Sequence, residues 1–277
     1  MTHSTVFFKL GAFCARILPP KLQNFVALHL LSSIQARGVA RKEIQSGVVL
    51  NLDLSDWFQR LYYLGLVEQQ TFKILKSLVP CGGTFVDVGA YIGLFSCIMA
   101  HHVGPNGSVI AFEPMSACFT QLRANISLNR LGNIQIQPIA LSNSAGRLPL
   151  YLPQYYGGTS AIAQVWNPSD WKPFETVSSA TLDQVFDGKS LDCIKIDVQG
   201  HEQEVLEGAV RLIERFHPVV LCELVGPHRN KNMKLLQNWG YEVFVNSNGR
   251  LSASLPGPMD GADFFFIHRK FQQEQLS

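Results

Sequence analysis

The stretch Thr84-Phe-Val-Asp-Val-Gly-Ala-Tyr-Ile-Gly93 decides the fold predicted for this chain. Its apolar residues Phe85, Val86 and Val88 are typical of a strand that is buried on both faces of a parallel sheet. The apolar segment Leu94–Met99 follows and is expected to be a helix. Glycine at positions 89 and 93 lets the backbone approach a ligand closely, and a helix start offers unpaired N–H groups. The stretch therefore predicts a strand, a tight turn and a helix that hold a nucleotide-like cofactor.

A second apolar strand, Val109–Phe112, follows the first and ends in Glu113-Pro114. In a doubly wound sheet, the acid at the end of the second strand lies beside the cofactor cleft, where it accepts hydrogen bonds from a ribose diol. Both a dinucleotide and S-adenosylmethionine carry such a ribose. The strand and its acid therefore predict one of these two ligands.

The composition of the turn favours S-adenosylmethionine. A pyrophosphate-binding turn has the pattern G-x-G-x-x-G, and here the bulky Tyr91 occupies the position of the middle glycine. Asp87 at the strand end is typical of methyltransferases rather than dehydrogenases. An NAD-linked oxidoreductase of the Rossmann type is the alternative hypothesis.

The overall composition limits the other classes of function. The chain has 277 residues, 47% of them hydrophobic, and a net charge of +2 without a basic run, so nothing indicates nucleic-acid binding. Six cysteines are scattered without C-x-x-C spacing, which suits a reducing compartment. No run is long and apolar enough to span a bilayer, and the N-terminus is a poor signal peptide, so a cytoplasmic protein is expected.

Two parts are expected along the chain. Residues 1–46 are predicted to form an N-terminal helical cap, with two short amphipathic helices that Pro19-Pro20 separates; their basic character also allows weak membrane association. Residues 47–277 are predicted to form the main domain. An aromatic-rich insertion at 148–177 is expected there, either as a surface for a sugar or apolar substrate or as a β-hairpin that buries its own aromatic side chains.

The main domain is predicted to be α/β, with a seven-stranded, mostly parallel sheet, an antiparallel edge strand and helices on both faces. Residues 47–54 are expected to be an edge strand or hairpin arm, and the 56–79 segment has a helical period. The seven strands are predicted near residues 84–88, 109–113, 134–141, 191–198, 218–224, 241–245 and 264–268. The last two are expected to pair in an antiparallel manner.

Polar residues gather where the strands end, and the ligand of an open α/β sheet lies beyond those ends. The predicted cofactor-binding residues are Asp87, Gly89, Ala90, Tyr91, Gly93, Glu113, Pro114, Ala140, Leu141, Ser142 and Asp197. Methyl transfer to an alcohol also needs removal of the acceptor's proton. His201 is a candidate general base, with Asp197 and Glu223 as further catalytic candidates. Mg²⁺ held by these two acids is an alternative that we do not favour, and no metal site is predicted.

Several motifs together resemble the FkbM-type methyltransferases. They are 85–94 (F-V-D-V-G-A-Y-I-G-L), 112–114 (F-E-P), 181–183 (T-L-D), 194–202 (I-K-I-D-V-Q-G-H-E) and 218–223, and the likeness extends over roughly residues 47–267. The resemblance implies the class I S-adenosylmethionine-dependent fold. It also implies O-methylation of a small-molecule acceptor: a sugar, a glycolipid, or a polyketide or other secondary metabolite of natural product biosynthesis. Tyr91, where the family most often has Asn, and Gln199, where it usually has Glu, depart from the pattern.

A third reading, a non-catalytic protein that binds S-adenosylmethionine, predicts that Asp197→Ala and His201→Ala change no activity. The acids at the strand ends make it the least favoured. The sequence predicts neither the identity of the acceptor nor the oligomeric state.

Overall fold

The computed structural model describes residues 37–65, 69–153, 171–224, 229–253 and 263–270. The described residues form two compact units, of which the first is 37–65 and the second contains all the others. The two amphipathic helices expected within residues 1–34 lie outside the described residues, as do Tyr155, Tyr156 and Trp166 of the expected insertion.

The first unit is a β-hairpin followed by a helix. Strands β1 (Val39–Gln45) and β2 (Val48–Asp53) pair antiparallel, which confirms the hairpin arm predicted at 47–54. Alternate residues of β2 are buried, as expected for a strand with one apolar face. Helix α3 (Trp57–Leu64) begins where the Asp56 side chain accepts a hydrogen bond from the Gln59 N–H. Since β1 falls before residue 46, the hairpin straddles the predicted boundary between the two parts of the chain.

The helical segment predicted at 56–79 is in fact two helices. Helix α3 ends at Gly65, whose φ of 75° lies in the left-handed region that closes helices. Helix α4 (Gln69–Leu78) belongs to the second unit. The predicted helical structure is therefore confirmed on both sides of Gly65, but Gly65 ends the first helix, so the segment forms two helices and not one.

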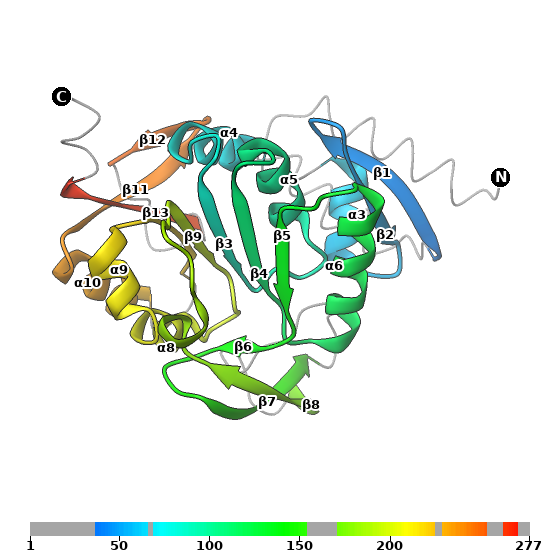
Figure 1. Cartoon of the computed structure of the whole chain (residues 1–277). Helices are drawn as coiled ribbons and strands as arrows, with labels where there is room; N and C mark the ends of the chain where they lie inside the picture. The colour runs from blue at the N-terminus through cyan, green and yellow to red at the C-terminus, as the bar shows by residue number, and fades with distance from the viewer. Residues whose placement is uncertain (1–36, 66–68, 154–170, 225–228, 254–262, 271–277) are drawn as a thin grey trace. The chain divides into compact units, whose positions relative to one another are not determined.

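The second unit is built on an eight-stranded sheet with the order β12-β11-β13-β10-β9-β3-β4-β5 (Figure 1). The five neighbours from β10 to β5 are parallel, whereas β13 runs antiparallel between β10 and β11. The strands are β3 (Thr84–Val88), β4 (Ser108–Phe112), β5 (Ile134–Gln137), β9 (Cys193–Ile196), β10 (Val219–Glu223), β11 (Tyr241–Ser247), β12 (Arg250–Ser252) and β13 (Asp263–His268).

This arrangement confirms the predicted α/β class and the antiparallel pairing of the last two predicted strands, now β11 and β13. The sequence did not predict the eighth strand, β12, which has only three residues and runs antiparallel to β11 at the sheet edge. Its residues, Arg250–Ser252, are mostly polar, so they carry no apolar pattern that would indicate a strand.

Helices connect the parallel strands, and the strand order reverses at the β3–β9 pair. Because such crossovers are right-handed, the helices that follow β3 and β4 cover one face and those that follow β9 and β10 cover the other. These helices are α5 (Leu94–Val103), α6 (Ser116–Leu128), α8 (Glu202–Glu207), α9 (Val210–Phe216) and α10 (Arg229–Asn238).

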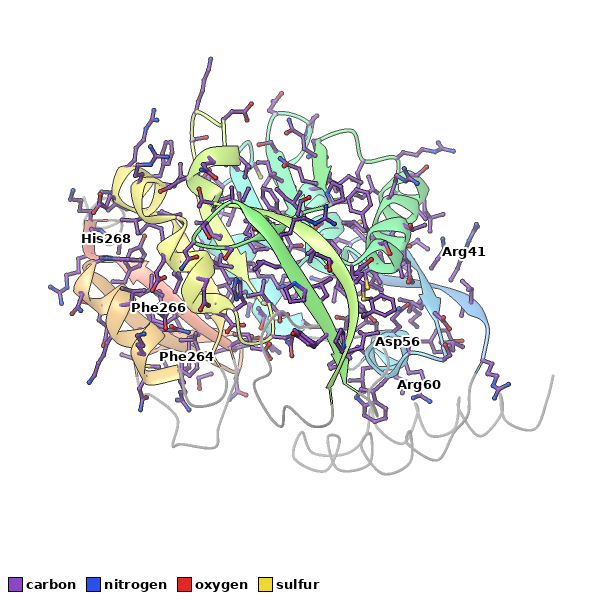
Figure 2. All side chains as sticks on the ribbon, turned by 90° about the horizontal axis from the view of Figure 1, so that it is seen from below. Arg41, Asp56, Arg60, Phe264, Phe266 and His268 are labelled. Carbon is purple, nitrogen blue, oxygen red and sulfur yellow. The ribbon has the colours of Figure 1, made fainter. Side chains whose placement is uncertain are left out.

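The core of this unit is formed by strands with no exposed face. All residues of β3 are buried, and Phe264 and Phe266 of β13 are completely buried, with ring centroids 6.4 Å apart (Figure 2). Continuous apolar strands of this kind occur where helices cover both faces of a sheet.

The third predicted strand, 134–141, is two strands. Pro138, which lacks an N–H group, follows β5, and the chain then forms β6 (Ala140–Leu141) in a different sheet. There β6 pairs with β8 (Trp171–Ala180), which in turn pairs antiparallel with β7 (Gly146–Pro153). The region predicted as an insertion thus contains a β-hairpin, but Phe174 of β8 is 51% exposed, so the predicted burial of the aromatic side chains does not hold for that residue. Residues 154–170 lie outside the described part.

Candidate active site

The turn between β3 and α5 is shaped by two glycines. Gly89 has a φ of 78°, and a Cβ atom there would overlap the backbone carbonyl oxygen of Asp197. Gly93 has a φ of 90°, and its Cβ atom would come within 2.5 Å of the Leu122 side chain. Both positions therefore need glycine for their conformation and for close packing. The first of them brings the end of β3 against the end of β9.

Main-chain N–H groups of this turn hold the end of β4. Gly89 and Ala90 both donate to the carbonyl oxygen of Phe112, at 3.0 Å. Tyr91, with a left-handed φ of 52°, donates from its N–H to Oε2 of Glu113 at 2.8 Å. The Met115 N–H donates to Oε1 of Glu113 at 2.9 Å. The carboxylate of Glu113 is thus oriented by backbone groups on both sides.

Glu113 is 5% exposed. Burial raises the pKa of its carboxyl from 4.5 to about 7, although the hydrogen bonds from Met115 and Tyr91 act in the opposite direction. Each carboxylate oxygen can accept more than one hydrogen bond, so two donors leave room for a diol. The Tyr91 side chain is partly buried against an apolar cluster that includes Met115 and Ala140, while its main chain supplies the N–H that positions Glu113.

Asp87, the acid at the end of β3, is completely buried. Its Oδ2 accepts a 2.6 Å hydrogen bond from the Ser96 hydroxyl. The Lys195 ammonium, which β9 brings alongside Asp87 in register, lies 3.5 Å from its Oδ1. The same ammonium lies 4.8 Å from the centre of the Phe95 ring. Asp87 therefore anchors side chains beneath the turn.

At the ends of β9 and β10, one amide joins two acids. Nε2 of Gln199 donates to Oδ1 of Asp197 at 2.8 Å and to Oε2 of Glu223 at 2.7 Å. Lys195 lies 3.4 Å from the other oxygen of Asp197, and the Asp197 side chain is 35% exposed. Gln199 has a left-handed φ of 55°, which aims its side chain at both acids. The structure thus brings Asp197 and Glu223 together, as predicted for strand ends.

The two acids of this pair differ in charge state. The negative charge of Asp197, helped by burial, raises the pKa of Glu223 well above its ordinary value. Burial acts to raise the pKa of Asp197 as well, but the Lys195 ammonium and the hydrogen bonds to the carboxylate outweigh it, so the pKa of Asp197 is lowered. At neutral pH the pair therefore holds one proton, on Glu223, and Asp197 is ionised.

His201 lies elsewhere in the site and is buried. Its Nε2 is 2.9 Å from Oγ of Ser142, which directly follows β6, and its Nδ1 is 3.4 Å from Oε2 of Glu204. Burial lowers the pKa of His201, although Glu204 and Glu207 act in the opposite direction. Figure 1 shows how β6 reaches this position, since it crosses below the carboxyl ends of β3 and β4 toward α8.

Three residues of the site were not among the predicted site residues. The two-residue period of a strand places Lys195 on the same face as Asp197, but no local pattern indicates that Lys195 also reaches Asp87. Ser96 carried no signal, and Gln199 was noted only as a departure from a family pattern. Asp183 of the T-L-D motif has a structural place, because its carboxylate accepts hydrogen bonds from the N–H groups of Arg211 and Leu212 at the start of α9.

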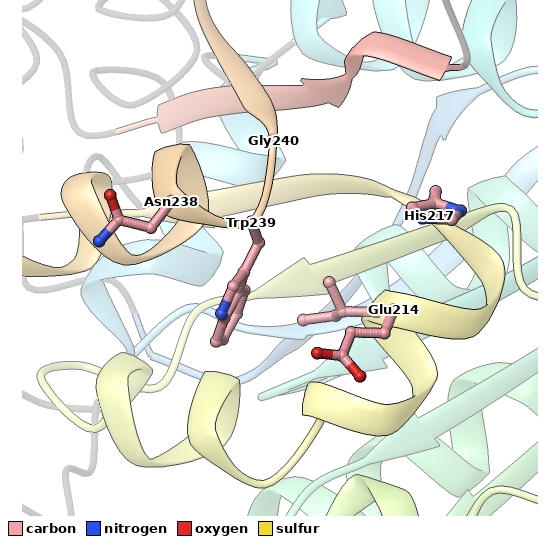
Figure 3. Close-up of a pocket in the computed structure, with 6 residues that line it drawn as sticks. Glu214, His217, Asn238, Trp239 and Gly240 are labelled. Atoms are coloured by element: carbon pink, nitrogen blue, oxygen red, sulfur yellow. The ribbon is translucent and has the colours of Figure 1, made fainter.

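Other features of the described residues fall outside this site. A pocket of about 400 Å³ lies between α9 and the end of α10, at the amino ends of β10 and β11, and is lined by Glu214, His217 and Trp239 among others (Figure 3). Among the described residues, no group of three or more His, Cys, Asp or Glu side chains is arranged to hold a metal ion. Within that part of the chain, no helix has the length and apolar character needed to cross a membrane.

Known proteins connect this architecture with a family. The sheet is mixed and mostly parallel, and structures similar to it are class I S-adenosylmethionine-dependent methyltransferases. The model of the methyltransferase FkbM domain matches residues 87–243, more than half of the chain. The chain therefore belongs to the FkbM methyltransferase family.

Individual relatives agree with this assignment. Methyltransferase sdnD of Sordaria araneosa is 31% identical over 160 residues, which cover 47% of this chain and 61% of that protein. Hexuronic acid methyltransferase AglP of Haloferax volcanii is 26% identical over 155 residues, 56% of this chain and 61% of that protein. The chain thus spans about three fifths of the length of both relatives. Among solved structures, methyltransferase FkbM from Methylobacillus flagellatus is similar with 16% identity and a TM-score of 0.44, covering 88% of this chain and 59% of that one.

Proposed function

We propose that this protein is an S-adenosylmethionine-dependent O-methyltransferase that acts on a hydroxyl group of a small molecule. One observation carries the proposal. A buried carboxylate, Glu113, is held by two backbone N–H groups at the end of β4, and an ionised Asp197 stands at the end of β9. The first group suits a ribose diol and the second suits a hydroxyl that must lose its proton.

S-adenosylmethionine supplies an electrophilic methyl group on its sulfonium. The residues of the chain bind and align the two reactants. Glu113 would hold the ribose diol, and the turn at 89–93 would lie beside the cofactor. The other predicted cofactor residues, including Pro114 and Ala140–Ser142, belong to the adenosine side. Alignment of the acceptor hydroxyl with the methyl group is the main task of such a site.

Asp197 is the proposed proton acceptor. With the cofactor bound, its sulfonium would supply the methyl group, and Asp197 would accept the proton that the acceptor hydroxyl loses. Lys195 keeps this carboxylate ionised, and Glu223 with Gln199 orients it. His201 is the other base predicted from the sequence, but its Nε2 is engaged with Ser142, so the geometry favours Asp197.

The proposed acceptor is a sugar, a glycolipid or a polyketide-like metabolite. One relative is named for its action on hexuronic acid, which makes hexuronic acids the first acceptors to test. The β7–β8 hairpin is proposed to shape the acceptor side, because it lies in the aromatic-rich segment 148–177 that was predicted as a surface for a sugar or apolar substrate.

Isothermal titration with S-adenosylhomocysteine and, separately, with NAD⁺ tests the cofactor, with and without Mg²⁺. We expect binding of S-adenosylhomocysteine without Mg²⁺, no binding of NAD⁺, and loss of binding in Glu113→Ala. Glu242→Ala is the matched control, because this carboxylate lies on β11, outside the candidate site, where it forms an ion pair with Arg269 at 3.5 Å. Binding of NAD⁺ alone would overturn the proposal in favour of an oxidoreductase.

A further inference from the structure

The contact between Ser142 and His201 joins two segments that are far apart in the sheet. Ser142 follows β5 and β6, and His201 follows β9. Two strands, β4 and β3, separate β5 from β9, a span of about 14 Å at the usual spacing of strands. The side chains nevertheless lie 2.9 Å apart, because β6 crosses the carboxyl ends of those two strands (Figure 1). The contact therefore lies at the end of the sheet where Glu113 stands.

The surroundings of Ser142 restrict its hydroxyl. The residue is 3% exposed, its N–H donates to the carbonyl oxygen of Ala180 at 2.9 Å, and a Cβ atom on Gly208 would overlap its carbonyl oxygen. The backbone is thus fixed on both sides. Since water has little access, protein groups decide in which direction the Ser142 hydroxyl donates its proton.

The contacts of His201 determine that direction. The carboxylate of Glu204, 3.4 Å from Nδ1, favours the tautomer with its proton on Nδ1. Burial keeps the imidazole neutral, since it lowers the pKa of His201. In this tautomer Nε2 is an acceptor, so the Ser142 hydroxyl donates to it and the lone pairs of Oγ remain for a third group.

We propose that Glu204, His201 and Ser142 form a hydrogen-bond relay that presents Ser142 Oγ as an acceptor to the 6-amino group of the purine of the bound cofactor. This proposal rests on the proposed function, because it requires adenosine at Glu113. It assigns His201 and Glu204 as positioning residues and Ser142 as the residue that discriminates between bases. A purine with a 6-oxo group offers no donor at that position and leaves Ser142 facing another acceptor, which is unfavourable.

The test compares the affinities for S-adenosylhomocysteine and for S-inosylhomocysteine, its 6-oxo analogue, by isothermal titration. We expect the wild type to bind the 6-amino compound about 10-fold more tightly, the effect of one buried hydrogen bond. Ser142→Ala should bring the two affinities together. Glu204→Lys should lower or reverse the preference, because lysine has only donors, so Nδ1 becomes the acceptor and Nε2 donates to Ser142.

Glu207→Lys is the matched control, since it makes the same change of charge on the same helix. The carboxylate of Glu207 accepts hydrogen bonds from Asn143 and Gln203, and His201 Nδ1 faces Glu204 instead. The preference should therefore persist in Glu207→Lys. An equal loss in both lysine variants, or a preference unchanged in Ser142→Ala, would overturn the relay while leaving cofactor binding intact. Absence of S-adenosylhomocysteine binding in the wild type would instead overturn the proposed function.

Discussion

Glu113 and Asp197 are both acids at the carboxyl ends of parallel strands, but different kinds of group hold them. The partners of Glu113 are the backbone N–H groups of Tyr91 and Met115. The partners of Asp197 are the side chains of Lys195 and Gln199. The two acids also differ in exposure, since Glu113 is 5% exposed as a residue and the side chain of Asp197 is 35% exposed.

The difference indicates a division of tasks. A carboxylate held by the backbone has a position that follows from the fold, which suits a cofactor that every turnover uses in the same way. A carboxylate held by side chains has a charge that its neighbours set, which suits proton transfer. Substitutions near Asp197 should therefore alter the charge of its carboxylate and the rate of methyl transfer. Substitutions in the turn near Glu113 should instead alter the backbone structure of the site.

The largest effect is expected from Gly89→Ala, because the two ends of the site touch at Gly89. The added Cβ atom would overlap the Asp197 carbonyl oxygen, and the φ of 78° is unfavourable for alanine. We expect a loss of about 3 kcal/mol or more in the free energy of unfolding, together with loss of S-adenosylhomocysteine binding. Denaturant titration and calorimetry measure both.

Gly82→Ala is the control for this substitution. Gly82 lies in a turn and has a comparable φ of 82°, but a Cβ atom there meets nothing within 4 Å. It should cost only about 1–2 kcal/mol, from backbone conformation alone. Equal costs in the two variants would show that the close approach of β3 and β9 at Gly89 does not hold the site together.

The next effect is expected from Asp197→Asn. Asparagine keeps the shape of the side chain but is a far weaker base, so the rate of methyl transfer should fall by about 100-fold or more. The measurement is the initial rate of transfer of labelled methyl to an acceptor found by screening. His201→Gln in the same assay tests the alternative base. A greater loss of rate in His201→Gln than in Asp197→Asn would show that His201, and not Asp197, is the general base.

Glu223→Gln should change how stability depends on pH. In the native state the charge of Asp197 and burial raise the pKa of Glu223, so Glu223 keeps its proton. In the unfolded state the pKa has its ordinary value, and the proton is released near pH 4.5. Since the native state binds more protons, raising the pH favours unfolding. The free energy of unfolding of the wild type should therefore fall between about pH 5 and 9, by up to about 1.4 kcal/mol per pH unit from this group.

Glutamine does not titrate, so Glu223→Gln should lose that part of the slope and gain stability relative to the wild type as the pH rises. Denaturant titrations at a series of pH values measure the difference. The surface substitution Glu242→Gln should leave the slope unchanged. Parallel curves for the wild type and Glu223→Gln would mean that Glu223 is ionised in the native state.

Sequence reasoning could predict the strand ends because each signal is local. An apolar run followed by an acid identifies Asp87, Glu113, Asp197 and Glu223 without knowledge of which strands are neighbours. The parallel sheet then brings these acids to one edge. The fold class and the meeting of Asp197 with Glu223 followed from that rule and are confirmed.

The remaining features depend on contacts between distant segments. The break at Pro138 was visible in the sequence, but nothing local indicated that β6 would leave the main sheet and pair with β8. The contact of Ser142 with His201 depends on that crossing. The two hydrogen bonds of Gln199 depend on the pairing of β9 with β10, so a single glutamine after a strand could not reveal them.

The smallest effect is expected from Gln199→Ala, which removes the donor that Asp197 and Glu223 share. One hydrogen bond to the ionised Asp197 and one to Glu223 are lost where water can partly replace them, so the free energy of unfolding should fall by about 1–2 kcal/mol. Gln203→Ala is the control, because this half-buried glutamine of α8 donates to Glu207, outside the Asp197–Glu223 pair. Gln199→Gly removes the same amide but tolerates the φ of 55°, so it should recover about 1 kcal/mol relative to Gln199→Ala. If Gln199→Ala is as stable as the wild type while Asp197→Asn still loses activity, then the ion pair with Lys195 is sufficient to orient Asp197. Asp197 would then differ from Glu113 only in having an ion pair in place of backbone hydrogen bonds.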